Sequence, residues 1–351
     1  MGPDFIASLC ERVRDHAARK APLRIRGGGT KDFYGEESRG EMLSVGEYAG
    51  IVVYEPKELV VTVRAGTPLG ELEATLAAER QMLPFEPPHF GGDATIGGAV
   101  ACGLSGPRRP YTGAVRDFVL GVRVVNGKGE DLSFGGRVIK NVAGYDVSRL
   151  MAGALGTLGV ITEISFKVLP LPAAEATLAF EMDEASATQQ ANRWAGQPLP
   201  LSATAWQEGL LRVRLSGAAS AIAAAKTKMG GEEVAAGSYW ADLREHRLPF
   251  FRSARTLWRL SVPQTADPIA TDGAQLVEWG GGLRWAGGDL DVLTVRSTAE
   301  RIGGHATLFR GGDRSIGVFH PLQPAVAKIH RRLKSAFDPE GILNPDRMYR
   351  F

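Results

Sequence analysis

Short runs of β-branched and other apolar residues alternate with polar and glycine-rich turns along the first half of the chain. This pattern predicts strands at Leu23–Arg26, 50–56, 58–66 and 159–172, and a hairpin over 117–134. Helices are predicted over 5–20 and 67–81, the second with Thr67 as its cap and Pro68 in its first turn. Strands and helices do not alternate regularly, so the pattern predicts an α+β fold rather than a doubly wound sheet.

The character of the chain changes after Pro172, where runs rich in Ala, Trp and Arg begin. The apolar pattern predicts strands over 176–182, 211–216 and 291–297, and helices over 184–196, 218–230 and 238–248. We therefore expect a smaller sheet covered on one side, and a last helix followed by a tail punctuated by proline and glycine. The predicted domains are 1–172 and 173–336, and the tail, 337–351, is expected to return to the first domain.

Composition narrows the class of protein only modestly. The 351 residues carry a formal charge of +2, which does not indicate a nucleic-acid partner. Two cysteines, Cys10 and Cys102, are too few for a disulfide framework or an iron–sulfur site within this chain. The N-terminal segment lacks the apolar stretch of a signal peptide, and no run reaches the length of a membrane helix, so we expect a cytoplasmic protein.

The chain has 44 glycines, and three segments of the first domain are rich in them: 26–31, 87–117 and 141–163. One such loop is a weak signal, but three beside strands or helix starts suggest a single long ligand that carries phosphate. Backbone N–H groups hold a diphosphate well where no side chain blocks the approach, and a helix N-terminus adds positive charge. Thr95 is the expected cap of such a helix, and Arg26, Arg108 and Arg109 are available to neutralise charge. The Rossmann, Walker and nucleophile-elbow motifs are all missing from the sequence.

The segments "RGGGT", "ATIGGAVACGLSGPRRPYTGAVRD" and "NVAGYDVSRLMAGALGTLGVITEISFKVLP" resemble the FAD-binding domain of the vanillyl-alcohol oxidase and p-cresol methylhydroxylase type. The closing "DPEGILNP" is typical of FAD-linked oxidases with that domain. Within the family, the sequence resembles the small FAD-binding subunits (E subunits) of glycolate oxidase. The resemblance implies a two-part FAD-binding domain followed by a smaller cap-like domain that contacts substrate or a partner.

Carried over residue by residue, the resemblance implies that FAD is held by the three segments. The implied residues are Arg26, Gly27, Gly28, Gly29, Thr30, Lys31, Pro87, Ala94, Thr95, Gly97, Gly98, Ala101, Gly103, Leu104, Gly106, Arg108, Tyr111, Gly156, Gly159, Val160 and Ile161. Many relatives bind flavin covalently through a histidine after the first glycines; Thr30 stands there in this chain, so the FAD is expected to be noncovalent. Asn141, Tyr145 and Asp146 are either polar contacts of the flavin or ordinary capping residues.

The residues that would carry catalysis are not identified by the sequence. Related 2-hydroxy-acid dehydrogenases have a histidine-rich metal motif, and the corresponding region keeps only His305 and His320, so no metal is expected. His305 is either structural or a base that faces the flavin. Arg252, Arg255 and Arg259 are spaced to share a helix face, which would either clamp a carboxylate or contact solvent or a partner.

The resemblance implies an FAD-binding subunit of a complex that oxidises glycolate to glyoxylate and passes electrons within itself. The implied partners are a larger flavin-containing catalytic subunit and an iron–sulfur subunit, through which the chain could reach a membrane. Two alternatives stay open. The chain could be an autonomous FAD-dependent 2-hydroxy-acid dehydrogenase, or a scaffold subunit whose FAD is structural.

Overall fold

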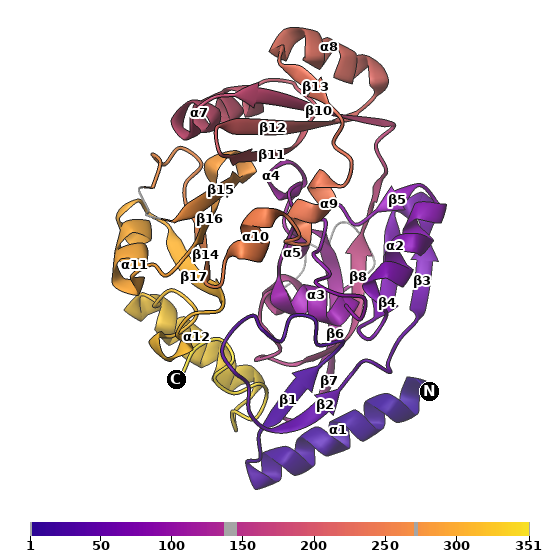
Figure 1. Cartoon of the computed structure of the whole chain (residues 1–351). Coiled ribbons are helices and arrows are strands. Elements are labelled where there is room, and N and C mark those ends of the chain that lie inside the picture. Colours follow the sequence, from indigo (N-terminus) through magenta and orange to yellow (C-terminus); the bar gives the residue numbers. More distant parts are fainter. Residues whose placement is uncertain (1, 137–145, 270–272, 351) are drawn as a thin grey trace.

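The computed structural model describes residues 2–136, 146–269 and 273–350. Two large antiparallel sheets dominate it, one built from the first half of the chain and one from the second (Figure 1). Over the described residues, none of the helices is both long enough and apolar enough to cross a membrane.

The first half of the chain holds nine strands and six helices within the described residues. The strands are β1 Leu23–Arg26, β2 Glu41–Ser44, β3 Ile51–Glu55, β4 Val60–Arg64, β5 Gln81–Met82, β6 Val119–Val125, β7 Asp131–Gly135, β8 Val160–Lys167 and β9 Leu169–Pro170. The helices are α1 Gly2–Arg19, α2 Leu69–Ala78, α3 Ile96–Cys102, α4 Arg109–Thr112, α5 Val115–Phe118 and α6 Val147–Met151.

The described part of the second half adds eight strands and six helices. The strands are β10 Ala174–Glu181, β11 Leu201–Gln207, β12 Leu210–Gly217, β13 Glu232–Val234, β14 Leu257–Ser261, β15 Ala274–Glu278, β16 Leu283–Gly287 and β17 His305–Arg310. The helices are α7 Glu184–Ala195, α8 Ala219–Met229, α9 Tyr239–Arg244, α10 Pro249–Ser253, α11 Val292–Arg301 and α12 Pro324–Phe337.

The first large sheet has the order β3-β4-β8-β6-β7, and one of its faces packs on the core of the first half. Val61 and Val63 of β4, and Ile164 and Phe166 of β8, are fully buried in that core together with residues of α2 and α3. A smaller parallel pair, β1 and β2, lies apart from this sheet. Buried side chains of α1 cover the pair, and the C-terminal tail pairs with it through a bridge between Leu23 and Leu343. The tail thus reaches the strand that leads into the first glycine segment.

The second large sheet has eight strands in the order β13-β10-β12-β11-β15-β16-β14-β17, so the prediction of a smaller sheet is wrong. Both faces of the sheet are covered. On β14, Leu257 packs with Tyr34 and other residues of the first half, whereas Trp258 packs against Val295 of α11. One face of the second sheet is therefore buried against the first half of the chain.

Two predicted elements of the second half differ from the structure. Residues 291–297 form the start of α11 rather than a strand, because Asp291 accepts a hydrogen bond from Thr294 N and caps a helix. The β-branched residues of that stretch favoured a strand in the pattern, but Val295 and Ala299 place one helical face in the core. The arginines of 252–259 do not share a helix face, because α10 ends at Ser253 and Arg259 lies on β14.

The two predicted turn features of the first half also need correction. Thr67 does not cap α2: its hydroxyl is fully buried and bonds to backbone atoms of Gly50 and Arg64, and Pro68 occupies the cap position. The hairpin of β6 and β7 is present, but its left-handed residue is Gly129, with φ of 69°, rather than a residue of the Asn126-Gly127 pair. Asn126 instead accepts hydrogen bonds from Lys128 N and Glu130 N.

Charged side chains tie the two halves together across their contact. Glu86 accepts hydrogen bonds from Arg108 (3.2 Å) and from Arg214 of β12 (2.8 Å). Arg108 also pairs with Glu175 of β10 at 2.7 Å. Both arginine side chains are only 7% exposed, so these charges are satisfied inside the contact between the halves.

Candidate functional site

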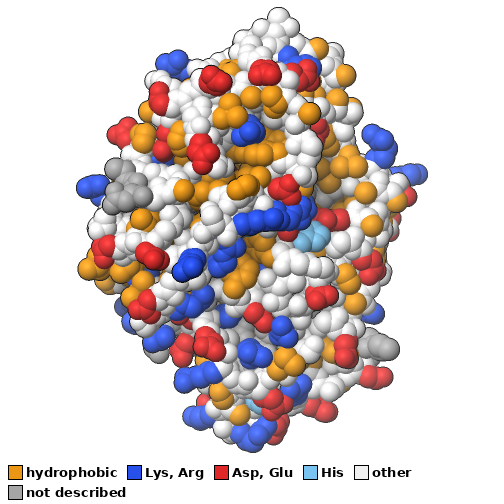
Figure 2. Space-filling view, in the orientation of Figure 1, with side chains coloured by type: hydrophobic (Ala, Val, Ile, Leu, Met, Phe, Trp, Pro, Cys, Tyr) orange, Lys and Arg blue, Asp and Glu red, His pale blue; other side chains and the backbone are white. Residues whose placement is uncertain are grey.

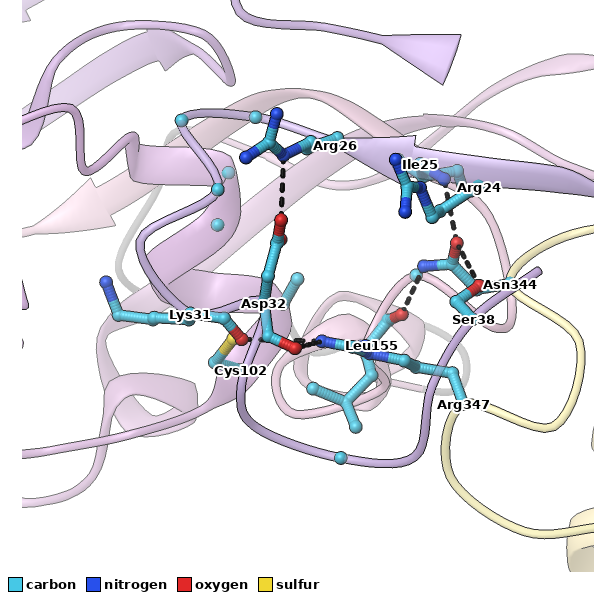
Figure 3. Close-up of a pocket in the computed structure, with 18 of the residues that line it drawn as sticks. Arg24, Ile25, Arg26, Lys31, Asp32, Ser38, Cys102, Leu155, Asn344 and Arg347 are labelled. Atoms are coloured by element: carbon cyan, nitrogen blue, oxygen red, sulfur yellow. Dashed lines mark hydrogen bonds and ion pairs between the residues drawn. The ribbon is translucent and has the colours of Figure 1, made fainter. Parts of the chain in front are cut away.

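A cavity of about 410 Å³ opens where the first glycine segment, α3, the residues before β8 and the C-terminal tail meet. Its size is within the range of pockets that hold cofactors. It brings together thirteen of the residues predicted to bind FAD: Arg26, Gly27, Gly28, Gly29, Thr30, Lys31, Thr95, Gly97, Gly98, Ala101, Gly156, Gly159 and Ile161. Segments that are distant in the sequence therefore share one cavity (Figure 3).

The first glycine segment offers the cavity a continuous row of hydrogen-bond donors. No described residue accepts a hydrogen bond from the backbone N–H groups of Gly27, Gly28, Gly29, Thr30 or Lys31. Successive N–H groups of a turn form a concave site for anions, and buried N–H groups rarely lack an acceptor. Five such donors on the wall of the cavity are the strongest sign of a ligand with many acceptor oxygens.

All three glycines in this segment are also required by the protein itself. A Cβ on Gly28 would lie 1.4 Å from Asp93 O, and a Cβ on Gly27 would lie 2.3 Å from Thr95 Oγ1. Gly29 has a φ of 75°, which side chains rarely adopt. Close contact with residues 93–95, together with access to ligand, explains the run of glycines.

The N-terminus of α3 has fewer free N–H groups for binding an anion than the sequence predicts. Thr95 caps the helix as predicted, with its hydroxyl accepting from Gly98 N at 3.3 Å. The N–H groups of Ile96 and Gly97 donate to Thr67 O and to Ala65 O, and the N–H of Ala99 bonds within the helix. The expected role of this helix end as an anion site is therefore not supported by its hydrogen bonds, and Gly97 serves packing: its Cβ would lie 2.7 Å from Ala65 Cβ.

The C-terminal tail contributes residues to the cavity that the sequence did not identify. Asn344 lines it, accepts hydrogen bonds from Ile25 N (2.7 Å) and from Ser38, and donates to Leu155 O (2.7 Å). This single side chain joins β1 to the loop before β8, as Figure 3 shows. The only sequence signal for it was the "DPEGILNP" motif, which marks the family without assigning a contact.

Positive charge surrounds the cavity, but its sources differ from those predicted. Arg24, Arg314 and Arg347 line it in addition to Arg26 and Lys31. Arg26 is paired with Asp32 at 2.8 Å on an exposed edge. Sequence reasoning missed Arg314 and Arg347 because they come from the last forty residues, far from the glycine segments. It missed Arg24 because this residue lies on β1, before the first glycine segment.

Lys31 is anchored rather than free. Its Nζ donates to His89 O at 3.1 Å, and burial lowers the pKa of its ammonium group. Thr30 also donates its hydroxyl to His89 O, at 2.7 Å. Cys102, which the sequence analysis did not assign to the site, lines the cavity, and burial raises its pKa to about 11, so the thiol is protonated and unreactive at neutral pH.

Eight of the predicted residues lie outside this cavity: Pro87, Ala94, Gly103, Leu104, Gly106, Arg108, Tyr111 and Val160. Leu104 and Gly106 line a second, smaller cavity. Arg108 is neutralised by carboxylates between the halves, as described above, and Arg109 stacks on Trp279 at 4.4 Å, so neither arginine faces the large cavity. Tyr111 packs with the buried residues of β10 and β12.

The remaining candidates contribute little to the cavity. Asn141 and Tyr145 lie outside the described residues, and Asp146 caps α6 by accepting from Arg149 N. His305 begins β17, and His320 is within 3.4 Å of Ala306 N. Within the described ranges, no three His, Cys, Asp or Glu side chains are grouped to hold a metal ion. That the chain binds no metal stays a prediction.

The observed donors fit an FAD molecule. The row of N–H groups from Gly27 to Lys31 matches a diphosphate in chemistry, and the surrounding arginines match its charge. At Gly98 and Gly159 the wall carries no side chain, so a ligand can approach the main chain there. Residues of three segments and the tail would therefore hold an elongated anionic cofactor.

Comparison with known sequences agrees with this cavity. A family described as an FAD binding domain matches residues 2–135. Glycolate oxidase subunit GlcE of Escherichia coli (strain K12) is 48% identical over 346 residues, which cover 99% of this chain and 98% of that protein. D-lactate dehydrogenase of Anaerostipes hadrus is 38% identical over 133 residues, which cover 38% of this chain and 28% of that protein.

Comparison with solved structures concerns the fold alone, because the sequence identities are low. The crystal structure of p-cresol methylhydroxylase with substrate bound matches with a TM-score of 0.72 at 17% identity, covering 97% of this chain and 87% of that one. An alkyldihydroxyacetonephosphate synthase matches with a TM-score of 0.66 at 16% identity, covering 97% and 75%. The prediction of an α+β fold of the p-cresol methylhydroxylase type is confirmed.

Proposed function

The chain belongs to the family of glycolate oxidase subunit GlcE, an FAD-binding family, and from this premise we propose that it is the FAD-binding subunit of a complex that oxidises glycolate to glyoxylate. The observation that carries the proposal is the row of five N–H groups, Gly27 to Lys31, which have no acceptor among the described residues and lie on the wall of a cavity of about 410 Å³. When bound, FAD supplies the acceptor for the electrons removed from the substrate carbon.

The chain's own residues position the cofactor and keep it from solvent. We assign the diphosphate to the segment 26–31, with Arg347 and Arg314 as the neighbouring cations. The other predicted contacts within the cavity are assigned to the same cofactor. Asn344 fixes the distance between β1 and the loop before β8, so it sets the width of the cavity.

We propose that the cofactor is held without a covalent bond. Thr30 stands after the glycines, and its hydroxyl is engaged with His89 O at 2.7 Å. Cys102 has a pKa raised by burial, so little thiolate is present to attack a flavin ring. Release of all flavin by acid precipitation, with a colourless pellet, is the expected result.

The relatives' names indicate a multi-subunit complex, since GlcE of Escherichia coli and GlcD of Bacillus subtilis are both described as glycolate oxidase subunits. We propose a larger flavin-containing subunit and an iron–sulfur subunit as the partners, and association with the inner face of a membrane through them. We also propose that residues 1–172 form the FAD-binding domain and 173–336 a cap-like or partner-binding domain, with 337–351 returning to the first. The segregation of the two large sheets supports this division.

The test compares the purified full chain with the assembled complex. The isolated chain is expected to show the visible spectrum of oxidised flavin, to keep it when glycolate is added, and to restore glycolate oxidation when mixed with its partners. A colourless chain that takes up no added FAD would contradict the proposal. Rapid bleaching of the isolated chain by glycolate would instead establish an autonomous dehydrogenase.

A further inference from the structure

One segment of the second half of the chain reaches the large cavity. Residues 311–319 follow β17, and we call them the bridging segment. Among the described residues of 173–336, Arg314 in this segment is the one that lines the cavity. Figure 2 shows Lys and Arg side chains running from the centre of the visible face toward the lower left, the side on which Figure 1 places β17 and α12. The second half thus brings a cation to a cavity that the first half and the tail otherwise line.

Two hydrogen bonds join the bridging segment to the loop that carries the main-chain donors. Arg314 donates from Nη2 to Gly35 O. Val318 donates its backbone N–H to Glu36 Oε1 at 2.6 Å, and Glu36 is only 7% exposed. Gly35 and Glu36 lie shortly after Lys31, the last residue of the row of free N–H groups. The bridging segment therefore contacts the cofactor loop itself and not a distant part of the first half.

Glu36 also connects this contact to the C-terminal tail. Its backbone N–H donates to Arg347 O at 2.9 Å, and its carbonyl oxygen accepts from Arg347 Nη1 at 2.8 Å. Arg347 is one of the residues that line the cavity. The cofactor loop, the tail and the bridging segment therefore meet at one residue, and the position of Glu36 affects the cavity wall.

The bridging segment is held firmly by the second half. Arg296 of α11 donates to Ile316 O at 3.0 Å and to Phe319 O at 3.2 Å. Leu308 of β17 donates its N–H to Val318 O at 2.9 Å. Because these bonds fix the segment to α11 and β17, a movement of the second half away from the first would carry the segment with it.

The guanidinium group of Arg314 has donors to spare for an anion. Only its Nη2 has an acceptor among the described residues, and no described carboxylate pairs with it. Arg26 is instead paired with Asp32, and Arg347 uses both Nη atoms on carbonyl oxygens. Arginine presents its donors in a planar fork that matches phosphate oxygens. The free donors of Arg314 at the edge of the cavity therefore suit the phosphate groups of a cofactor.

We propose that the bridging segment closes over bound FAD and controls its release, with Arg314 pairing with the phosphate charge and Glu36 holding the segment in place. The inference rests on the proposed function and deepens it, because retention of the cofactor then depends on contact between the two halves of the chain. FAD leaves only when the bonds of Arg314 and Glu36 to the opposite half are broken.

The first test follows the release of FAD from the full flavin-loaded chain after dilution, by the rise in flavin fluorescence. Arg314→Met is expected to speed release by about tenfold or more. Glu36→Ala removes the acceptor of the Val318 N–H and should speed release about threefold or more, whereas Glu36→Gln keeps an acceptor oxygen and should stay within about twofold of the wild type. Arg301→Met, at an exposed arginine that ends α11, is the matched control and should release FAD as the wild type does.

The second test separates closure over the cofactor from a merely structural contact. Amide hydrogen exchange of residues 311–319 is measured for the full chain without flavin and after FAD is added. In the wild type, FAD is expected to slow this exchange, including that of the Val318 N–H. In Arg314→Met the slowing by FAD should be lost, although a purely structural arginine would leave it unchanged.

The thermal midpoint is recorded for each variant. If Arg314→Met does not fold, Arg314→Lys carries both tests, because lysine keeps the charge and loses the forked geometry, so its release rate should lie above that of the wild type. Release from the folded Arg314 variants at the wild-type rate would overturn the inference, as would exchange of 311–319 that FAD does not change. A wild-type chain that takes up no FAD would instead contradict the proposed function.

Discussion

The two cavities of this protein offer different chemical groups to a ligand: main-chain N–H groups in the large cavity and side-chain groups in the small one. The large cavity presents main-chain donors of Gly27 to Lys31, with glycines in its other walls and arginine side chains around it. The small cavity presents a half-buried arginine (Arg259), a histidine (His246) and a carboxyl group (Glu278) among aromatic rings. A main-chain site tolerates no new side chain, whereas a side-chain site depends on the charge state and identity of each group.

This difference decides what a sequence can reveal. Clustered glycines reveal a main-chain site because few other residues allow close approach and left-handed backbone. The residues of the small cavity come from 88–107, 243–259 and 278–309, and none of them is unusual in its own segment. Substitutions in the two cavities should therefore have different effects on flavin content, on stability and on the pH dependence of stability.

The largest effect is expected at Gly28. Gly28→Ala places a Cβ 1.4 Å from Asp93 O, a backbone atom that cannot turn aside. We expect the segment to separate from residues 93–95, with complete loss of flavin and a loss of about 3 kcal/mol or more in the free energy of unfolding. Flavin absorbance and denaturant unfolding measure the two effects.

The matched control is Gly92→Ala, where an added Cβ meets no atom within 4 Å. This variant should keep its flavin and its stability. Equal flavin content in the two variants would show that glycines of this region are not constrained as described.

The next effect is expected at Glu278 and depends on pH. Because burial raises its pKa to about 7 from the usual 4.5, the folded state holds a proton that the unfolded chain releases. The free energy of unfolding therefore falls as pH rises from about 4.5 to 7. Glu278→Gln removes this dependence and should stabilise the protein by roughly 2–3 kcal/mol at pH 8, with no gain near pH 4.

Urea unfolding at several pH values measures this difference. Glu181→Gln, at an exposed carboxylate of β10, is the control and should show no such gain. A gain for Glu278→Gln that is the same at pH 4 and pH 8 would contradict the assigned ionisation.

Substitutions at the two adjacent glycines of α3, Gly97 and Gly98, should distinguish an effect on packing from an effect on FAD binding. Gly97→Ala brings a Cβ within 2.7 Å of Ala65 Cβ and 3.0 Å of Ala65 O, so it should destabilise the fold by about 1–3 kcal/mol. Gly98→Ala meets only Thr95 Oγ1, at 3.2 Å, and lines the large cavity, so it should retain stability and bind FAD more weakly. Thermal unfolding and FAD titration distinguish the pair, and a reversed order of the two effects would refute this separation.

Much of the first half could be predicted from its sequence because local signals agree with the fold there. The strands at 23–26, 51–55 and 60–64 have β-branched runs bounded by turns, and three glycine segments converge as expected. Asn344 and Arg347 could not be placed, because their role depends on the tail pairing with β1 more than three hundred residues earlier.

The second half was harder to predict for a physical reason. Its sheet is buried on both faces, so strands such as Leu257–Ser261 and Leu283–Gly287 have no alternation of apolar and polar residues. Arg259 and Arg284 lie on those strands, where charged residues argue against burial in any pattern. The small cavity could therefore not be predicted from the sequence, in which the arginine spacing places Arg259 on a helix face.

The smallest effect is expected at Thr95, and it tests which donors serve the large cavity. Thr95→Ala removes the cap of α3 and should cost about 1 kcal/mol in the free energy of unfolding, whereas Thr95→Ser keeps the hydroxyl and most of the stability. The substitution also frees the N–H of Gly98, a residue that lines the cavity already supplied with donors by Gly27 to Lys31. FAD affinity should therefore change by less than about threefold, since a neutral N–H adds little where five are present. A large drop in affinity without a matching loss of stability would assign the hydroxyl of Thr95 itself to the ligand.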